Sequence, residues 1–320
     1  MNDIAIIGAG AWGTALAIQA ARAGNAVTLW ARDPARARAI ESARENPRLP
    51  GIHLPEAIAV TADLPATARA FLLAVPVQHM RAVAARLPSG GAPLLVCAKG
   101  VEAGSLRLPL EILGEVHPGR PAAVLSGPTF AAEIARGLPA AAVIAATDPA
   151  LRAHLTQLLA TPAFRLYGND DPIGVQAGAA AKNVIAIAAG VVIGAGLGEN
   201  ARAALITRAV AELSRLIVAL GGRTETAMGL SGLGDLLLTC TGPSSRNFSL
   251  GHALGRGESL ASILAGRSSV TEGVATAPAL IARAGDLDMP ICTAVAALVS
   301  APAGVADLMA GLLARPRRDE

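Results

Sequence analysis

Three glycines near the amino terminus constrain the fold more than any other feature of the sequence. The segment IAIIGAGAWGTALA places Gly8, Gly10 and Gly13 in a GxGxxG spacing, between an apolar run and an alanine-rich helical stretch. In that context Gly8 permits a tight turn, Gly10 lets the backbone approach a pyrophosphate, and Gly13 lets the helix pack closely on the strand. The phosphates would lie at the N-terminus of the helix. The pattern therefore predicts a dinucleotide-binding loop rather than a purely structural turn.

Short apolar runs alternate with helical stretches through the first half of the chain. Runs rich in Val, Ile and Leu that are separated by helices indicate a parallel sheet covered on both faces. Five runs are expected as strands: DIAIIG, AVTLWA, FLLAV, PLLVCA and AAVLSG. PAAAVIAA is a candidate for a sixth strand, and AFRLYG is a candidate for a later edge strand. Beyond about residue 174 the strand pattern fades, and the apolar segments are typical of helices, many ended by glycine. The sequence predicts an α/β fold, with a Rossmann-type parallel-sheet domain over residues 1–180 and an all-α C-terminal domain over residues 181–320.

The hydropathy of the chain raises the question of a membrane span, because 52% of the residues are hydrophobic and 16% are charged. A span needs about 20 predominantly apolar residues. The uncharged run 183–198 is shorter than that and the run 289–306 contains two prolines, so neither is expected to cross a membrane. The opening MNDIAIIGAG lacks the basic region and cleavage site of a secretory signal. Cys97, Cys240 and Cys292 show no CxxC spacing, which suits a reducing compartment. We expect a cytoplasmic protein without a membrane span.

Charge and composition disfavour two classes of ligand. The net charge is +3 and aromatic residues make up 2% of the chain, too few for stacking platforms on nucleic acid. The histidines form neither an HExxH motif nor a pair four residues apart, so no metal site is predicted. The mild positive balance fits small anionic molecules as partners.

One lysine, Lys182, lies in the apolar segment QAGAAAKNVIAIAAGVVIGAGLG, residues 176–198. Burying an unpaired ammonium is costly. The lysine therefore indicates either a membrane span that tolerates one charge or a core that retains a lysine for chemistry. The lengths of the apolar runs favour the second explanation. We expect Lys182 on a helix where the two domains meet, facing the cleft between them.

The end of the second predicted strand bears on the cofactor. It reads LWARDP, with Arg32 roughly 20 residues beyond the glycine loop. An acidic residue there would favour NAD because it can hydrogen-bond the 2′-hydroxyl of the cofactor's ribose, whereas an arginine can hold the 2′-phosphate of NADP. Asp33 precedes Pro34 and is equally well explained as a helix N-cap. The sequence favours NADPH and leaves NADH open.

Three further segments carry polar residues between apolar runs. They are CAKGVE with Lys99, LSGPTFAAE covering residues 125–133, and GLGDLLLTCTGPSSRNFSLG with Asp235, Arg246 and Asn247. Taken singly, each has a simpler explanation as a loop lysine, a turn, a helix cap or a surface charge. The chain contains no GxSxG motif, so a hydrolase with a nucleophile elbow is not supported.

Taken together and in order, these segments resemble bacterial NAD(P)-dependent glycerol-3-phosphate dehydrogenases over nearly the whole chain. The similar segments also include GAGAWGTALA, SGPTFAAEIARGLPAA, GVQAGAAAKNVIAIAAG, GENARAALITRAVAE and VTEGV. The resemblance implies a Rossmann domain followed by a helical domain and a homodimer. It also implies interconversion of dihydroxyacetone phosphate and sn-glycerol 3-phosphate for phospholipid synthesis. The nearest alternatives are a 6-phosphogluconate or β-hydroxyacid dehydrogenase, which GLGDLLLTCTGPSSRN does not resemble, and a non-catalytic nicotinamide sensor.

The resemblance also implies a role for individual residues. Lys182 corresponds to the proton acceptor and to a substrate contact; further substrate contacts are implied at Lys99, Gly127, Thr129, Asp235, Ser245, Arg246 and Asn247. Cofactor contacts are implied at Gly8, Gly10, Ala11, Trp12, Gly13, Arg32, Lys99, Ala131, Arg246, Val270 and Glu272. The family often has serine where this chain has Ala11, so a hydroxyl contact would be lost there while a backbone contact is retained.

These roles make chemical sense for a three-carbon ketone phosphate. Arg246 beside Asn247 and Ser245 could clamp the phosphate dianion. Lys182, supported by Lys99, could stabilise the negative charge that develops on the carbonyl oxygen and deliver its proton. Asp235 would orient the ammonium group.

Overall fold

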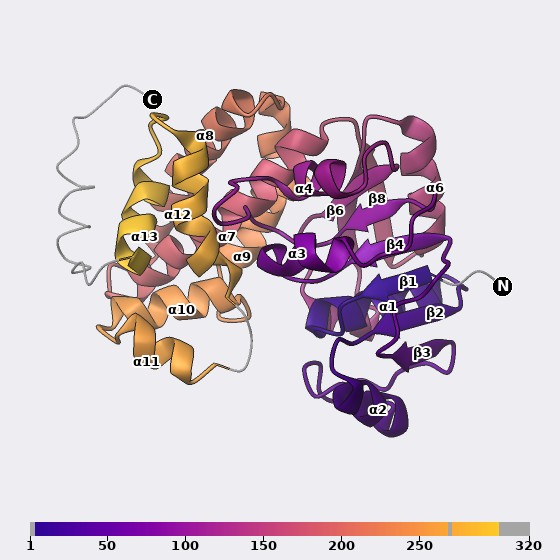
Figure 1. Cartoon of the computed structure of the whole chain (residues 1–320). Helices are drawn as coiled ribbons and strands as arrows, with labels where there is room; N and C mark the ends of the chain where they lie inside the picture. The colour runs from indigo at the N-terminus through magenta and orange to yellow at the C-terminus, as the bar shows by residue number, and fades with distance from the viewer. Residues whose placement is uncertain (1–3, 268–270, 301–320) are drawn as a thin grey trace. The chain divides into compact units, whose positions relative to one another are not determined.

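The computed structural model describes residues 4–267 and 271–300, and the chain forms two compact units (Figure 1). Unit 1 consists of Met1–Lys99 and Arg107–Gln176. Unit 2 consists of Gly100–Leu106 and Ala177–Glu320. Unit 1 is built around a sheet and the described part of unit 2 is helical, which confirms the predicted α/β fold with an all-α second part.

Unit 1 contains one eight-stranded sheet in the order β3-β2-β1-β4-β5-β6-β7-β8. The predicted apolar runs all form strands, and β8 lies at an edge, as expected. One strand, β3, was not predicted. In its short sequence IAVT only Ile58 and Val60 are buried, so the strand lacks a continuous apolar run. The strands are β1 Ile4–Ile7, β2 Val27–Trp30, β3 Ile58–Thr61, β4 Ala70–Leu73, β5 Leu94–Val96, β6 Ala122–Ser126, β7 Ala140–Ala145 and β8 Phe164–Asn169.

One pair of neighbouring strands departs from the predicted parallel sheet. β7 runs antiparallel to β6, with Leu125 opposite Ile144, whereas every other neighbouring pair is parallel. The helix between them, α5, covers only Ala131–Arg136 and spans about 9 Å, too little to return the chain along the sheet. The longer α6, Pro149–Leu159, does return it, and β8 is parallel to β7.

Helices complete unit 1 and leave the central strands without exposed side chains. All residues of β1 and β4 are buried, which explains their continuous apolar sequences. The carboxyl ends of β1, β2, β4 and β5 lie at one edge of the sheet because these strands are parallel. The remaining helices of this unit are α1 Ala11–Arg22, α2 Pro34–Ala43, α3 Val77–Ala84 and α4 Pro109–Val116.

The described part of unit 2 consists of helices, including a short π-helix, η2, immediately before α9. The sequence GLSGLGD around η2 is rich in glycine, and a methyl group on Gly232 would lie 2.6 Å from the carbonyl carbon of Ala227. The elements are α7 Pro172–Gly194, α8 Gly198–Ala219, the 3₁₀-helix η1 Thr224–Met228, η2 Leu230–Gly234, α9 Asp235–Cys240, α10 Arg246–Gly255, α11 Leu260–Ala265, α12 Glu272–Ala284 and α13 Pro290–Ser300.

Helix α7 corrects the expectation that no apolar segment is long enough to cross a membrane. It has 23 residues, and its most apolar stretch of 18 residues has a mean hydropathy of 1.7, sufficient by length and composition alone. The uncharged run 183–198 begins after Lys182, whereas the helix begins at Pro172 and includes that lysine. In the structure 89% of this apolar stretch is buried within the protein, which is typical of a core helix.

Candidate functional site

The glycine loop joins β1 to α1, as the sequence predicts. Gly8 has φ of +119°, a conformation that favours glycine. A methyl group on Gly8 would lie 2.9 Å from the carbonyl oxygen of Ala74, and one on Gly13 would lie 3.1 Å from the carbonyl carbon of Gly8. A methyl group on Gly10, by contrast, would meet no atom of the described chain within 4 Å. Gly10 is the point where another molecule can approach the backbone, so the loop fits a pyrophosphate.

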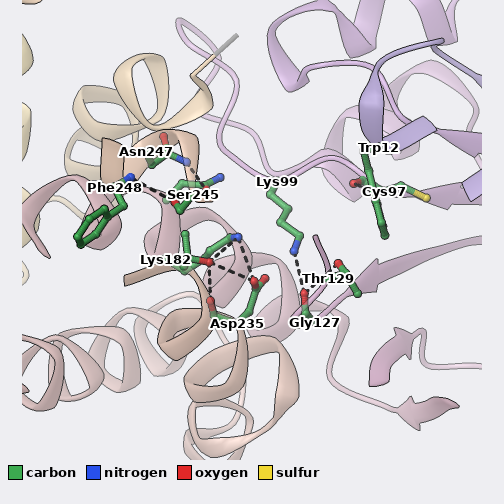
Figure 2. Close-up of polar contacts among 12 residues, drawn as sticks. Trp12, Cys97, Lys99, Gly127, Thr129, Lys182, Asp235, Ser245, Asn247 and Phe248 are labelled. Carbon is green, nitrogen blue, oxygen red and sulfur yellow. Dashed lines mark hydrogen bonds and ion pairs between the residues drawn. The ribbon is translucent and has the colours of Figure 1, made fainter. Parts of the chain in front are cut away.

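The first turn of α1 is suited to an anion. Gly10 is its N-cap, no side chain caps it, and its first turn contains no acidic residue. The backbone N–H groups and the positive end of the helix dipole are therefore available to a phosphate. Ala11 contributes a backbone N–H group here and no hydroxyl. Trp12 donates a hydrogen bond from Nε1 to the carbonyl oxygen of Cys97, 3.0 Å away, which ties α1 to the end of β5 (Figure 2).

Two side chains that sequence reasoning missed support the glycine loop. Asn46 is fully buried, and its Nδ2 donates to the carbonyl oxygen of Ala9 at 3.1 Å and to Oγ1 of Thr14 at 2.6 Å. Arg36 also donates to the carbonyl oxygen of Ala9 and, at 3.2 Å, to Oδ1 of Asn46. Asn46 has no local sequence signal, because it reaches the loop only through the fold.

The end of β2 presents basic side chains. Arg32 is exposed, and Asp33 caps α2 by accepting a hydrogen bond from the backbone N–H of Ala35 at 2.9 Å. The pKa of Arg36 is lowered by burial and by the positive charge of Arg48. The negative charge of Asp33 partly offsets this lowering. The contact between Arg32 and a 2′-phosphate stays a prediction.

A third group of predicted residues lies at the carboxyl ends of β5 and β6. Nζ of Lys99 donates to the carbonyl oxygen of Gly127 at 3.2 Å, and Oγ1 of Thr129 donates to the same oxygen at 3.2 Å (Figure 2). Gly127 has φ of +146°, and a methyl group on it would lie 2.9 Å from Cα of Ala142. The adjacent Ser126 is 2% exposed, and its hydroxyl makes no hydrogen bond within the described part of the chain. Ala131, four residues after Gly127, begins α5.

In unit 2, Lys182 belongs to a buried cluster. Its Nζ lies 3.0 Å from Oδ1 of Asp235 and 3.0 Å from Oγ1 of Thr239 (Figure 2). Lys182 is 8% exposed and Asp235 1% exposed. Oγ1 of Thr239 donates to the backbone oxygen of Asp235 at 2.5 Å, which leaves a lone pair for the ammonium. The predicted partnership of Lys182 with Asp235 is therefore present.

Thr239 was missed by sequence reasoning, although a signal existed. It lies four residues after Asp235, on the same face of a helix. The π-helix η2 and Gly178 place Asp235 near α7, because a methyl group on Gly178 would lie 3.0 Å from the carbonyl oxygen of Ser231. π-Helical turns often occur at functional sites.

The N-terminus of α10 carries the three residues predicted to clamp a phosphate. Ser245 is the N-cap, and its hydroxyl accepts from the backbone N–H of Phe248 at 3.2 Å (Figure 2). Asn247 is buried, donates from Nδ2 to Oδ1 of Asn183 at 2.9 Å, and accepts from the backbone N–H of Gly273 at 3.0 Å. The side chain of Arg246 is exposed and makes no hydrogen bond with the described residues.

Arg267 adds a second arginine beside Arg246. Its guanidinium donates to the backbone oxygen of Arg246 at 2.8 Å and to Oγ1 of Thr271 at 3.3 Å. The pKa of Arg267 is lowered by burial and by the charge of Arg246. Glu272 begins α12, directly after Thr271. Val270, the other cofactor contact predicted in this segment, lies outside the described residues.

The predicted residues thus fall into separate groups within each unit. Unit 1 holds the glycine loop, Arg32 and the Lys99–Gly127–Thr129 group; unit 2 holds the Lys182–Asp235–Thr239 cluster and the N-terminus of α10. Among the described residues, no group of three or more His, Cys, Asp and Glu side chains is arranged to hold a metal ion.

Known proteins similar to this chain share both units. The NAD-dependent glycerol-3-phosphate dehydrogenase N-terminus family matches residues 3–152, and the corresponding C-terminus family matches residues 171–310. Glycerol-3-phosphate dehydrogenase [NAD(P)+] of Gluconobacter oxydans is 54% identical over 98% of this chain and 97% of its own length. The enzyme of the same name from Caulobacter vibrioides is 53% identical over 100% and 99%.

A solved structure agrees with these sequence relatives. The crystal structure of glycerol-3-phosphate dehydrogenase from Coxiella burnetii superposes with a TM-score of 0.94 and 36% identity, covering 98% of this chain and 99% of that one. Both family matches, the relatives and the structure span the sheet unit and the helical unit together. The chain therefore belongs to the NAD-dependent glycerol-3-phosphate dehydrogenase family.

Proposed function

We propose that this protein catalyses the reversible reduction of dihydroxyacetone phosphate to sn-glycerol 3-phosphate with NADPH or NADH. The observation that carries the proposal is the buried Lys182–Asp235–Thr239 cluster, in a chain whose other unit has a glycine loop suited to a pyrophosphate. The family supports the same reaction. The product is the glycerol phosphate from which glycerophospholipids are built.

Lys182 is the proposed proton donor in the direction of reduction. An ammonium group has three N–H donors, and Asp235 and Thr239 accept two of them. The third donor is left for the substrate oxygen. The bound nicotinamide supplies the hydride. As negative charge develops on the oxygen, the positive Lys182 stabilises it and delivers the proton, and in oxidation the neutral lysine removes the proton.

Asp235 and Thr239 position Lys182 for this step. A lysine side chain has four flexible bonds, and two fixed oxygens 3.0 Å from Nζ restrict it to one place. Burial makes both contacts stronger than they would be in water. Lys99, whose Nζ contacts the carbonyl of Gly127, is the proposed second cation for the substrate.

The N-terminus of α10 is the proposed site for the substrate phosphate. Arg246 can form two parallel hydrogen bonds to a phosphate. Asn247 uses its oxygen and one N–H within the protein, so a single N–H remains for the substrate. Asn247 therefore serves the site in two ways, as one donor and as the link between α10 and the neighbouring helices.

Cofactor, location and assembly complete the proposal. Arg32 favours NADPH over NADH through the 2′-phosphate. Cys97, Cys240 and Cys292 are buried free thiols, in keeping with a cytoplasmic enzyme. A homodimer is the assembly that the resemblance implies, and light scattering on the purified protein tests it.

The decisive experiment follows NADPH oxidation by absorbance with dihydroxyacetone phosphate as the sole acceptor. Turnover that requires both compounds, and that reverses with sn-glycerol 3-phosphate and NADP⁺, is the expected result. No turnover with dihydroxyacetone phosphate, together with turnover of another ketone or hydroxy acid, would overturn the proposal. Binding of NADPH without turnover of any acceptor would support the non-catalytic sensor instead.

A further inference from the structure

Helices α7 and α10 cross with their backbones in contact. A methyl group on Gly190 of α7 would lie 2.7 Å from the backbone nitrogen of His252, and closer still to the carbonyl oxygen of Phe248. One on Gly251 of α10 would lie 2.8 Å from the carbonyl carbon of Ile187. Real Cβ atoms essentially never approach other atoms within 3.0 Å, so a side chain at either position would force the two helix backbones apart.

The same arrangement repeats one turn further along each helix. A methyl group on Gly194 would lie 2.9 Å from the carbonyl carbon of His252, and one on Gly255 would lie 2.9 Å from the backbone nitrogen of Ala195. The crossing is thus made by two GxxxG pairs, Gly190 with Gly194 and Gly251 with Gly255. Small residues at this spacing let helix backbones approach closely. All the atoms that meet are backbone atoms, which cannot adopt another rotamer to relieve a clash.

The crossing joins the two parts of the proposed substrate site in unit 2. α7 carries Lys182 at one end of the crossing, and α10 begins with Arg246 and Asn247. At that end Asn247 donates to Asn183 at 2.9 Å, and a methyl group on Gly273 would lie 2.6 Å from Oδ1 of Asn247. The position of Lys182 relative to the N-terminus of α10 is therefore set by backbone packing and one buried amide pair.

We propose that this glycine crossing is a positioning device that fixes the distance between Lys182 and the phosphate-binding N-terminus of α10, and thereby selects substrates in which a single methylene group separates the carbonyl carbon from the phosphate ester oxygen. The inference rests on the proposed function, because it takes the substrate phosphate to bind at Arg246. A displacement of about 1 Å in a reacting group can cost roughly 10²-fold in rate. A methyl group inserted between the helices displaces them by a distance of that order.

The test compares Gly190→Ala and Gly251→Ala with the wild type on two substrates, dihydroxyacetone phosphate and dihydroxyacetone. The phosphorylated substrate needs both ends of the site, whereas the unphosphorylated one does not use α10. We expect kcat/KM for dihydroxyacetone phosphate to fall by about 10²-fold and kcat/KM for dihydroxyacetone to fall much less. The ratio of the two is the readout that a purely structural role would leave unchanged.

A matched control and a milder variant accompany the test. Gly114 lies in α4, and a methyl group on it would meet no described atom beyond the backbone of its own helix within 4 Å, so Gly114→Ala should keep the ratio of the wild type. Gly255→Ala places its methyl group in the last turn of α10, far from Arg246, and should change the ratio by a smaller factor. NADPH titration and thermal unfolding of each variant report the folded fraction.

The outcomes separate this inference from the proposed function. If the wild type does not reduce dihydroxyacetone phosphate, the proposed function fails. If the wild type does so and the folded glycine variants lose activity on both substrates in equal proportion, the crossing serves stability alone and the inference is wrong. The inference is equally withdrawn if none of the three crossing variants folds, because the glycines are then needed for folding itself.

Discussion

The glycine loop of unit 1 and the lysine cluster of unit 2 offer their ligands different kinds of groups, backbone N–H donors in the loop and a charged side chain in the cluster. Around Gly10 an added methyl group would meet no described atom within 4 Å, and the groups available there are backbone N–H donors. Lys182 is 8% exposed and lies 3.0 Å from the side-chain oxygens of Asp235 and Thr239. The loop binds through its backbone conformation, whereas the cluster acts through side chains.

This difference has a consequence for substitutions. A backbone N–H group remains when its side chain changes, so the loop accepts Ala11 where serine is common in the family. A buried ion pair that loses one member leaves a charge that must be neutralised or paired in another way, so such a change alters the site itself. Side-chain changes in unit 2 should therefore have larger effects on turnover than side-chain changes at the rim of the cofactor site in unit 1.

The largest effect is expected for Lys182→Met. Loss of the proton donor should lower kcat by about 10²–10⁴-fold, and loss of oxyanion stabilisation adds to this. Methionine keeps the length and apolar stem of the lysine, but Asp235 is left without its counter-ion and is free to bind a proton. We expect the variant to stay folded and to bind NADPH with nearly unchanged affinity.

The measurement is kcat beside thermal unfolding and NADPH titration of one preparation, with Leu237→Met as a control on the exposed face of α9. A folded Lys182→Met variant that keeps a tenth of the wild-type kcat would remove Lys182 from the acid–base role, and Lys99 would then be the next candidate. A fall in activity that follows the folded fraction would indicate a structural lysine.

A smaller effect is expected for Arg246→Ala. Removing a charged hydrogen-bond donor to a phosphate costs about 1.5–3 kcal/mol, or roughly 10- to 150-fold in kcat/KM for dihydroxyacetone phosphate. Dihydroxyacetone has no phosphate, so its much lower kcat/KM should change little. Arg267→Ala is the informative control, because Arg267 contacts the backbone of Arg246 and not its side chain. Equal losses on both substrates would place Arg246 away from the substrate phosphate.

A still smaller effect, confined to cofactor preference, is expected for Arg32→Asp in unit 1. An exposed charge pair contributes up to about 1 kcal/mol, so the ratio of kcat/KM for NADPH to that for NADH should fall roughly fivefold. Asn46→Ala provides the contrast, because Asn46 supports the loop that both cofactors would share. That variant should weaken the binding of NADPH and of NADH to a similar extent. An unchanged ratio in Arg32→Asp would show that Arg32 does not bind the 2′-phosphate.

The smallest effect concerns a buried carboxylate of unit 2 outside the lysine cluster. Glu212 is 1% exposed and accepts backbone hydrogen bonds from Ile291 at 2.7 Å and Cys292 at 3.2 Å, at the start of α13. Burial raises the pKa of Glu212 above its ordinary value of 4.5, although these hydrogen bonds and the charge of Arg215 oppose the rise. Glu212 therefore binds a proton more tightly in the folded protein than in the unfolded chain.

The sign of the pH dependence follows from that shift. A raised carboxyl pKa means that the free energy of unfolding declines as the pH rises from the ordinary pKa through the raised one. The Glu212→Gln variant cannot ionise at this position, so its melting temperature should lack this decline. The difference in melting temperature between the wild type and the variant should therefore change over that pH window. The kcat of the variant should stay near the wild-type value. A difference that is constant across the window would mean that Glu212 does not titrate in the folded protein.

Much of the fold was predictable because its signals are local. Continuous apolar runs mark strands that are buried on both faces, and the glycine loop must directly follow a strand and begin a helix. The half-exposed β3 and the reversed β7 were not predicted. The alternation in IAVT is too short to distinguish from a loop, and the direction of β7 depends on how far the short α5 can carry the chain.

The sequence by itself determined which residue types are present and, through its segments, the family. It identified Lys182 as an ion that the apolar core must accommodate. Only the tertiary structure decided which groups accommodate it, because Asp235 and Thr239 are more than 50 residues away along the chain. It likewise decided that Asn46 supports the glycine loop and that four glycines join α7 to α10. Contacts of this kind depend on backbone positions fixed by the packing of whole helices. A local pattern such as the GxxxG spacing indicates that a close approach is possible, but it does not identify the helix that makes it.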